Sequence, residues 1–197
     1  MEFSEVLARR RMVRNYADEP VDVEVLEEVA RAAFRAPSAG NSQGLGVVLI
    51  TDPDIRKEVA RIAEEDEYVA MGFDPWISRA PGHIVISVSE EVYHRRYQEP
   101  DKLGPDGEIE WPVPYWWVDA GAAMMAVLLA AVDKGLAAGF LGVHSVPDLS
   151  ALVGLPADQK PIGIITVGRP APDRRSRSLD RRPARENVIV HRDRWQG

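Results

Sequence analysis

The run from Ala120 to Val132 limits most strongly how this chain can fold. It consists only of alanine, glycine, methionine, valine and leucine, and Asp119 and Asp133 flank it. A helix that is apolar nearly all round must be buried in a core or in a large subunit interface. Because the run is shorter than the roughly 20 residues that cross a bilayer, we predict a buried helix over about residues 118–134 and no membrane association.

Other apolar runs predict a sheet with helices between its strands. We expect strands at 46–50, 83–88 and 162–167, a strand or turn at 139–143, and a last short strand at 188–190. Helical periodicity predicts helices near residues 3–9, 22–34, 53–63 and 147–153. Strands that alternate with helices, in a chain of 197 residues without a linker, indicate one α+β or three-layer α/β/α domain.

Composition excludes several classes of function. The chain has no cysteine, which excludes disulfides, thiolate metal sites and a cysteine nucleophile, and fits a reducing cytoplasm. A net charge of −7 argues against binding to nucleic acid or to an anionic membrane. Four scattered histidines lack ligand spacing, so we predict no metal site. No secretion signal is visible, so we predict a cytoplasmic location.

The segment Ala36–Gln43 is unusually polar for a loop between a helix and a strand. Pro37 ends the preceding helix, and Gly40 permits a positive φ or a close approach to a ligand. Hydrogen-bonding side chains fill the rest: Ser38, Asn41, Ser42 and Gln43. The loop could therefore direct several donors at one flat partner. Alternatively, its side chains could cap their own backbone.

Four arginines lie within six residues near the N-terminus: Arg9, Arg10, Arg11 and Arg14. Arginine binds phosphate through two parallel hydrogen bonds and keeps its charge. The cluster could neutralise a phosphate or place a fixed positive charge beside a redox ring. It could also be a solvated basic face or pair with the acidic surface.

Together, Arg10–Tyr16 and Ala36–Gln43 resemble, at this separation, the nitroreductase superfamily of FMN-dependent oxidoreductases. The apolar helix and the Gly139–Gly142 turn also fit this family, so the resemblance extends over nearly the whole chain. It implies a mostly antiparallel central sheet flanked by helices, in an intertwined homodimer. It also implies one domain over residues 1–197, with a C-terminal arm at about 169–197.

The resemblance implies a flavin site built from two chains. The implied FMN-binding residues are Arg10, Arg11, Met12 and Arg14; Pro37, Ser38, Ala39 and Asn41 of the other protomer; Leu141 and Gly142; and Arg181. Arg14 would lie against the N1 and C2 carbonyl edge of the ring, where a cation makes reduction easier. Met12 stands where the family usually has a serine, which leaves only its backbone to contact the phosphate.

An insert at about residues 89–117 ends in aromatic residues. A connection of this length with little periodicity is more often functional or mobile than plain. We predict that Trp111, Tyr115 and Trp116 form a lid or wall over the flavin, against which flat substrates stack. The alternative is that these rings pack the core or the dimer interface.

The implied activity is ping-pong transfer of electrons from NAD(P)H, through FMN, to a small planar nitroaromatic or quinone-like acceptor, with no acid–base residue required. Same-fold alternatives are a reductive dehalogenase, a flavin destructase and a deazaflavin-using enzyme. Met12 stands where the destructase pattern has an acidic residue, which disfavours that alternative. Two further alternatives are not enzymes: a non-catalytic flavin- or nucleotide-binding module, and a purely structural dimer.

Overall fold

The computed structural model describes residues 1–173 and 190–195. Its four-stranded sheet consists of β1 (Leu45–Ile50), β2 (Gly82–Ser89), β3 (Ala137–Gly142) and β4 (Gln159–Gly168). The helices are α1 (Phe3–Arg9), α2 (Val23–Arg31), α3 (Pro53–Ile62), α4 (Glu65–Ala70), α5 (Trp76–Arg79), α6 (Glu90–Tyr97), α7 (Tyr115–Asp133) and α8 (Leu149–Leu152). Three short 3₁₀ turns are η1 (Ala32–Arg35), η2 (Ala39–Asn41) and η3 (Val143–Ser145).

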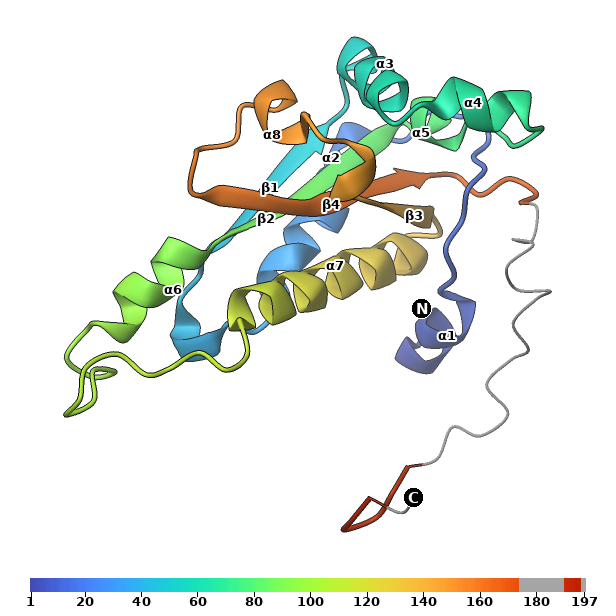
Figure 1. Ribbon diagram of the computed structural model, residues 1–197. Helices are drawn as coiled ribbons and strands as arrows, with labels where there is room; N and C mark the ends of the chain where they lie inside the picture. The colour runs from blue at the N-terminus through green and yellow to red at the C-terminus, as the bar shows by residue number, and fades with distance from the viewer. Residues whose placement is uncertain (174–189, 196–197) are drawn as a thin grey trace.

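The sheet lies between two layers of helices, with α2 and α7 on one face and α3, α5 and α8 on the other (Figure 1). All of its pairings are antiparallel, in the order β1-β2-β4-β3. Leu26 of α2 and Leu128 of α7 belong to one core cluster, and Val59 of α3 and Ile77 of α5 belong to the other. The predicted three-layer fold with an antiparallel sheet is therefore confirmed.

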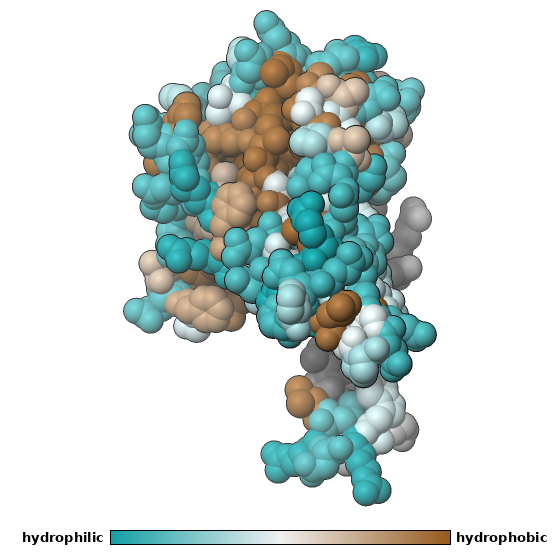
Figure 2. Space-filling view, turned by 90° about the vertical axis from the view of Figure 1, so that its left-hand side faces the viewer, coloured by the Kyte–Doolittle hydropathy of each residue, from teal (hydrophilic) through white to brown (hydrophobic). Residues whose placement is uncertain are grey.

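Of the two central strands, β2 is buried throughout and β4 is buried from Gly163 onward, whereas β1 and β3 are edges. Every residue of β2 is buried, because β1 and β4 flank it and helices cover both faces. On the side of the molecule that bears β1 and α8, an apolar area is surrounded by hydrophilic residues (Figure 2). Half-buried Val48, Leu152 and Val153 pack there on the second core cluster. The predicted strand at 188–190 lies outside the described residues except for Val190.

Helix α7 confirms the predicted central helix but is longer than its apolar run. Ala120, Ala123 and Val127 lie in the core, whereas Trp117 and Met125 on the other face are 41% and 42% exposed. Among the described residues, α7 is the one helix long and apolar enough to cross a membrane. A core helix meets the same criterion, and α7 packs on the sheet beside α2 (Figure 1).

Glu65 determines the shape of the chain between α3 and β2. Its carboxylate is buried and accepts hydrogen bonds from the backbone N–H of Ile77 at 2.5 Å and of Ser78 at 3.1 Å. These bonds satisfy N–H groups of the first turn of α5, which have no partner within the helix. They also hold Trp76, the first residue of α5, in a fixed position on the sheet.

Buried His83 makes this region sensitive to acid. Its ring is fully buried on β2, and Nε2 donates a hydrogen bond to the carbonyl oxygen of Ile77 at 2.8 Å. Nδ1 is therefore the unprotonated nitrogen, and it is buried without a hydrogen-bond partner. Burial lowers the pKa of His83 from the ordinary 6.5 to about 4, and the charge of Arg56 adds to this effect.

Because of His83, we expect the free energy of unfolding to decrease as the pH is lowered. Between about pH 6.5 and pH 4 the unfolded chain binds the proton and the folded chain does not, so acid favours unfolding. The loss is about 2 kcal/mol by pH 5 and about 3 kcal/mol below pH 4. Urea unfolding at about pH 7.5 and about pH 5 measures it. The His83→Gln variant can still donate to Ile77 but does not titrate, so this part of the pH dependence of the free energy of unfolding should vanish. If it persists in the variant, His83 is not its cause.

Candidate active site

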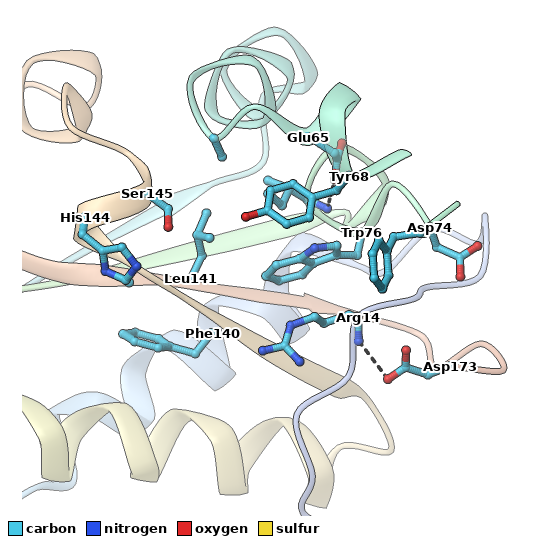
Figure 3. A pocket seen from close by; sticks show the side chains of 14 residues that line it. Arg14, Glu65, Tyr68, Asp74, Trp76, Phe140, Leu141, His144, Ser145 and Asp173 are labelled. Atoms are coloured by element: carbon cyan, nitrogen blue, oxygen red, sulfur yellow. Dashed lines mark hydrogen bonds between the residues drawn. The ribbon is translucent and has the colours of Figure 1, made fainter. Parts of the chain in front are cut away.

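A cavity of about 410 Å³ opens where the N-terminal segment crosses the end of β3 (Figure 3). Its walls come from four parts of the chain: Arg14; Ala63, Glu65, Tyr68, Phe73, Asp74, Trp76 and Ile77; Phe140, Leu141, Gly142, His144 and Ser145; and Asp173. The rings of Tyr68, Phe73, Trp76 and Phe140 and one guanidinium thus face the same space. This combination suits a flat, electron-accepting ring.

Backbone pairing with β3 positions Arg14. Val13 donates its N–H to the carbonyl oxygen of Ala138 at 3.0 Å, and Met12 forms a parallel bridge with the same residue. The buried hydroxyl of Tyr16 lies 2.7 Å from the Thr166 hydroxyl on β4. Burial raises the pKa of Tyr16 far above its ordinary range, so this hydroxyl stays protonated. The segment is therefore fixed on both sides of Arg14.

The Arg14 guanidinium points into the cavity beneath Trp76, and its Cζ lies 5.7 Å from the centre of that ring (Figure 3). A guanidinium over an indole face is favourable and loses little freedom when it binds an anion. The backbone N–H of Arg14 points the other way and donates to Asp173 at 3.1 Å. Arg11 also donates to Asp173, at 3.3 Å. Asp173 thus ties the C-terminal segment to the N-terminal arginines.

Two glycines of β3 permit this close packing. A Cβ on Gly139 would lie 2.5 Å from the carbonyl oxygen of Val13 and 3.0 Å from both Thr166 and Trp76. A Cβ on Gly142 would lie 2.8 Å from the His144 ring. Gly139 therefore lets the Arg14 segment lie on β3. Gly142 leaves room for the His144 ring and borders the cavity through its backbone alone.

The polar loop 36–43 lies elsewhere, beside α6 and the first turns of α7. Asp119 accepts the backbone N–H of Ala39 at 2.8 Å, and Arg96 donates to the carbonyl oxygen of Gly40 at 2.9 Å. Gly40 has a φ of +61° and lies against the Tyr97 ring. Positive φ at this position explains the glycine. Pro37 and Asn41 are exposed.

Part of the loop's polarity serves its own backbone. Ser42 donates to the Ala39 carbonyl oxygen at 2.6 Å, and the Ser38 hydroxyl accepts the N–H of Gln43 at 3.2 Å. The structure therefore supports the self-capping alternative for Ser38 and Ser42, and exposed Asn41 accepts a hydrogen bond from Gln43 Nε2 at 3.2 Å. That the loop directs donors at a ligand stays a prediction.

Replacing Asp119 with alanine is expected to loosen this loop. The carboxylate also accepts the Tyr93 hydroxyl at 2.7 Å, so the change leaves two partly buried donors without an acceptor. We expect a loss of about 2 kcal/mol in the free energy of unfolding, measured by urea denaturation. Asp133→Ala, at the exposed end of the same helix, is the matched control and should have little effect. Equal effects of the two changes would contradict the role of Asp119.

The aromatic insert is a packed structure. Trp116 is 6% exposed and belongs to the core, with its ring centre 6.1 Å from that of Tyr93. Trp111 is half-buried, lies 4.6 Å from the Tyr97 ring and donates Nε1–H to Glu108 at 2.7 Å. The structure thus favours the core-packing alternative for Trp116. Tyr115 is 45% exposed.

The structure brings together only some of the predicted residues. Arg14, Leu141 and Gly142 share the large cavity, and Met12 lies behind it on β3. Arg11 lines a separate cavity of about 180 Å³ beside Leu136. Among the described residues, neither cavity has Arg10, the 36–43 loop, Trp111, Tyr115 or Trp116 in its wall. Arg181 lies outside the described residues.

The 36–43 loop lies at the N-terminal end of α7, whereas the segment after α1 that contains Arg14 pairs with β3, which follows the C-terminal end of α7 (Figure 1). A site that contains both Arg14 and Asn41 therefore requires a second chain, and this part of the prediction stays a prediction. Clusters of three residues that could hold a metal ion are absent from residues 1–173 and 190–195.

Several cavity residues were not predicted. Tyr68, Phe73 and Trp76 lie in a stretch of mixed pattern, and Asp173 and His144 stood out by no motif. The sequence did offer one signal for these residues: three aromatic residues follow the acidic run 64–67. Aromatic side chains are common in the walls of ligand pockets. Their convergence depends on the buried Glu65, which sequence reasoning did not recognise as a cap.

The cavity residues fit the ring of a flavin. The guanidinium of Arg14 and the Trp76 and Phe140 rings offer a cation and flat apolar walls in one space, and Gly142 adds backbone without a side chain. A cation beside flat apolar walls suits a flavin ring. Arg14 would hold the ring's carbonyl edge, and Gly142 would present its backbone to the ring.

Comparisons with known proteins identify the family of this chain. The nitroreductase family model matches residues 7–169. An iodotyrosine deiodinase of Nematostella vectensis is 29% identical over 212 residues, covering 96% of this chain and 75% of that protein. An FMN reductase [NAD(P)H] of Bacillus subtilis is 26% identical over 181 residues, covering 84% of this chain and 64% of that protein. The structure of a nitroreductase family protein from Streptococcus pneumoniae has a TM-score of 0.72 at 20% identity, covering 97% and 100% of the two chains. This chain belongs to the nitroreductase family.

Proposed function

We propose that this protein is an FMN-dependent oxidoreductase that takes electrons from NAD(P)H and passes them to a small planar aromatic acceptor. The supporting observation is the cavity of about 410 Å³ in which Arg14 faces Trp76 beside the backbone of Gly142. Bound FMN would supply the hydride chemistry. The FMN reductase relative supports this choice of cofactor.

The chain's own residues would bind and orient. Arg14 would hold its charge against the carbonyl edge of the flavin ring and stabilise negative charge there. Tyr68 and Phe73 are 52% and 45% exposed at the cavity, so they offer apolar surface on which an aromatic acceptor can stack. They would also exclude water when the acceptor binds.

We propose that two chains complete each site. The outer face of α7 exposes Trp117, Val118 and Met125, apolar side chains that a second chain could cover. A symmetric dimer would cover this face and could bring Asn41 of one chain toward Arg14 of the other.

A mixing experiment tests the shared site. Arg14→Ala and Asn41→Ala homodimers should each be impaired, but unfolding and refolding them together gives heterodimers with one intact site. We expect about a quarter of the wild-type activity to return, because half of the dimers are mixed and each of these has one intact site of two. No recovery in verified heterodimers would contradict a site shared between chains.

An absorbance spectrum followed by anaerobic titration tests the cofactor and the electron donor. Purified protein supplied with FMN should be yellow, and NADH or NADPH should bleach it in a stoichiometric reaction. Parallel loading with a deazaflavin distinguishes that alternative. Protein that stays colourless with FMN, or coloured protein that neither nicotinamide reduces, would overturn the proposed oxidoreductase.

Reductive removal of halide from an aromatic ring is the second candidate. It is favoured by the iodotyrosine deiodinase relative, which matches 96% of this chain. The aromatic wall of Tyr68 and Phe73 would suit a halogenated phenol as well as a quinone. Reduced protein mixed with 3-iodotyrosine or with 1,4-benzoquinone separates the two: iodide release supports dehalogenation, and reoxidation by the quinone alone supports the first proposal.

A further inference from the structure

The short turn η3 places His144 in the cavity wall. This histidine has no role yet in the proposed chemistry. His144 follows β3 by two residues, and its ring faces the cavity near Leu141 and Phe140 (Figure 3). The residue is exposed, so its ring can exchange protons with solvent. Histidine changes charge closest to neutral pH among ordinary side chains.

The ring is oriented with one edge toward the backbone and the other away from it. A Cβ built on Gly142 would lie 2.8 Å from Nδ1 and from Cε1 of His144, but 4.0 Å from Nε2. Nε2 is therefore the ring nitrogen farthest from Gly142. Because Gly142 lines the same cavity, a ligand seated over its backbone would lie within reach of the imidazole.

Other titratable groups also line the cavity. These groups are Arg14, Glu65, Tyr68, Asp74 and Asp173. Glu65 accepts backbone N–H groups of α5, Asp173 is bound by Arg11 and the Arg14 backbone, and Asp74 lies 4.0 Å from Arg79. Within the described chain, no hydrogen bond or ion pair holds the His144 ring.

We infer that His144 is a catalytic residue that donates a proton to the oxygen of the acceptor. This inference rests on the proposed function and defines its substrate class: acceptors whose reduction creates an O–H bond. For a quinone, hydride delivery adds two electrons and one hydrogen, and His144 adds the proton, giving the neutral aromatic diol. The imidazole then recovers its proton from solvent, and no further reactant is needed.

A rapid-mixing experiment with two oxidants tests this role. The reduced holoprotein is mixed with 1,4-benzoquinone, which needs a proton, or with ferricyanide, which takes electrons alone. We expect His144→Gln to slow reoxidation by the quinone at least about tenfold and to leave reoxidation by ferricyanide and reduction by NAD(P)H unchanged. His191→Gln, which changes a histidine outside the cavity wall, is the matched control.

A second measurement does not depend on turnover. In the cofactor-free protein, 1,4-dihydroxybenzene should shift the ring ¹⁵N signals of His144 in NMR spectra, and the shift should be lost in the Ser145→Trp variant, which narrows the cavity. If NAD(P)H reduces the wild-type flavin but His144→Gln keeps the wild-type quinone rate, the inference about His144 fails alone. If NAD(P)H does not reduce the wild-type protein, the proposed function fails and the inference fails with it.

Discussion

Arg14→Ala is expected to weaken FMN binding and slow its reduction by NAD(P)H by about a hundredfold each, the largest change at any cavity residue. The guanidinium is the only arginine in the wall of the large cavity among the described residues, and Trp76 holds it there. Its loss removes the fixed positive charge that stabilises the reduced ring. A contact of this kind typically contributes about 3 kcal/mol, which corresponds to about a hundredfold.

Fluorescence titration with FMN and stopped-flow reduction measure these effects separately. Arg14→Lys should recover part of the rate, because it restores charge but not the planar fork. Arg9→Ala is the matched control, since Arg9 is exposed and pairs with Glu5 on the surface of α1. If Arg14→Ala and Arg9→Ala have the same FMN affinity and the same reduction rate, the flavin does not bind against Arg14 and the proposed site is wrong.

Gly139→Ala is expected to have the second largest effect, and it acts on the scaffold. The added Cβ would lie 2.5 Å from the Val13 carbonyl oxygen, and a backbone atom cannot rotate away as a side chain can. The N-terminal segment must therefore move off β3, which disrupts its pairing with Ala138. Overpacking of this kind lowers the free energy of unfolding by about 1–3 kcal/mol, and we expect a loss near the upper end of this range.

The expected result is a lower midpoint of urea unfolding together with loss of FMN binding, because Arg14 lies in the displaced segment. Gly104→Ala is the control: its Cβ would come no closer than 3.4 Å to another atom, in an exposed turn. An unchanged midpoint for Gly139→Ala would show that the segment does not lie against β3 as described.

Much of the fold could be predicted from the sequence. The strands at 46–50, 83–88 and 162–167 and the helix around 118–134 agree with β1, β2, β4 and α7 within a few residues. These elements have uniform apolar runs, and burial on both sides follows directly from such runs. Helices α4, α5 and α6 were not predicted, because they are at most eight residues long and their pattern is mixed.

The candidate site could be predicted only in part. Arg14, Leu141 and Gly142 do share a cavity, as the family resemblance implied. Trp116 shows the limit of this reasoning. Its position in a run of aromatic residues favoured a lid, but in the structure it lies in the first turn of α7 and is buried in the core. A run of aromatic residues indicates that rings gather, but not whether they face a ligand or each other.

The sequence by itself determined the layers of this protein, because apolar periodicity is a local property that each segment has before it meets any other. Only the tertiary structure decided which side chains meet around the cavity. Arg14 reaches it because Val13 pairs with Ala138 on β3, and Trp76 reaches it because Glu65 caps α5. The pairing with β3 joins segments more than a hundred residues apart, and the bond from Glu65 depends on a turn without periodicity. No local pattern encodes either contact, so the cavity exists only once the chain has folded.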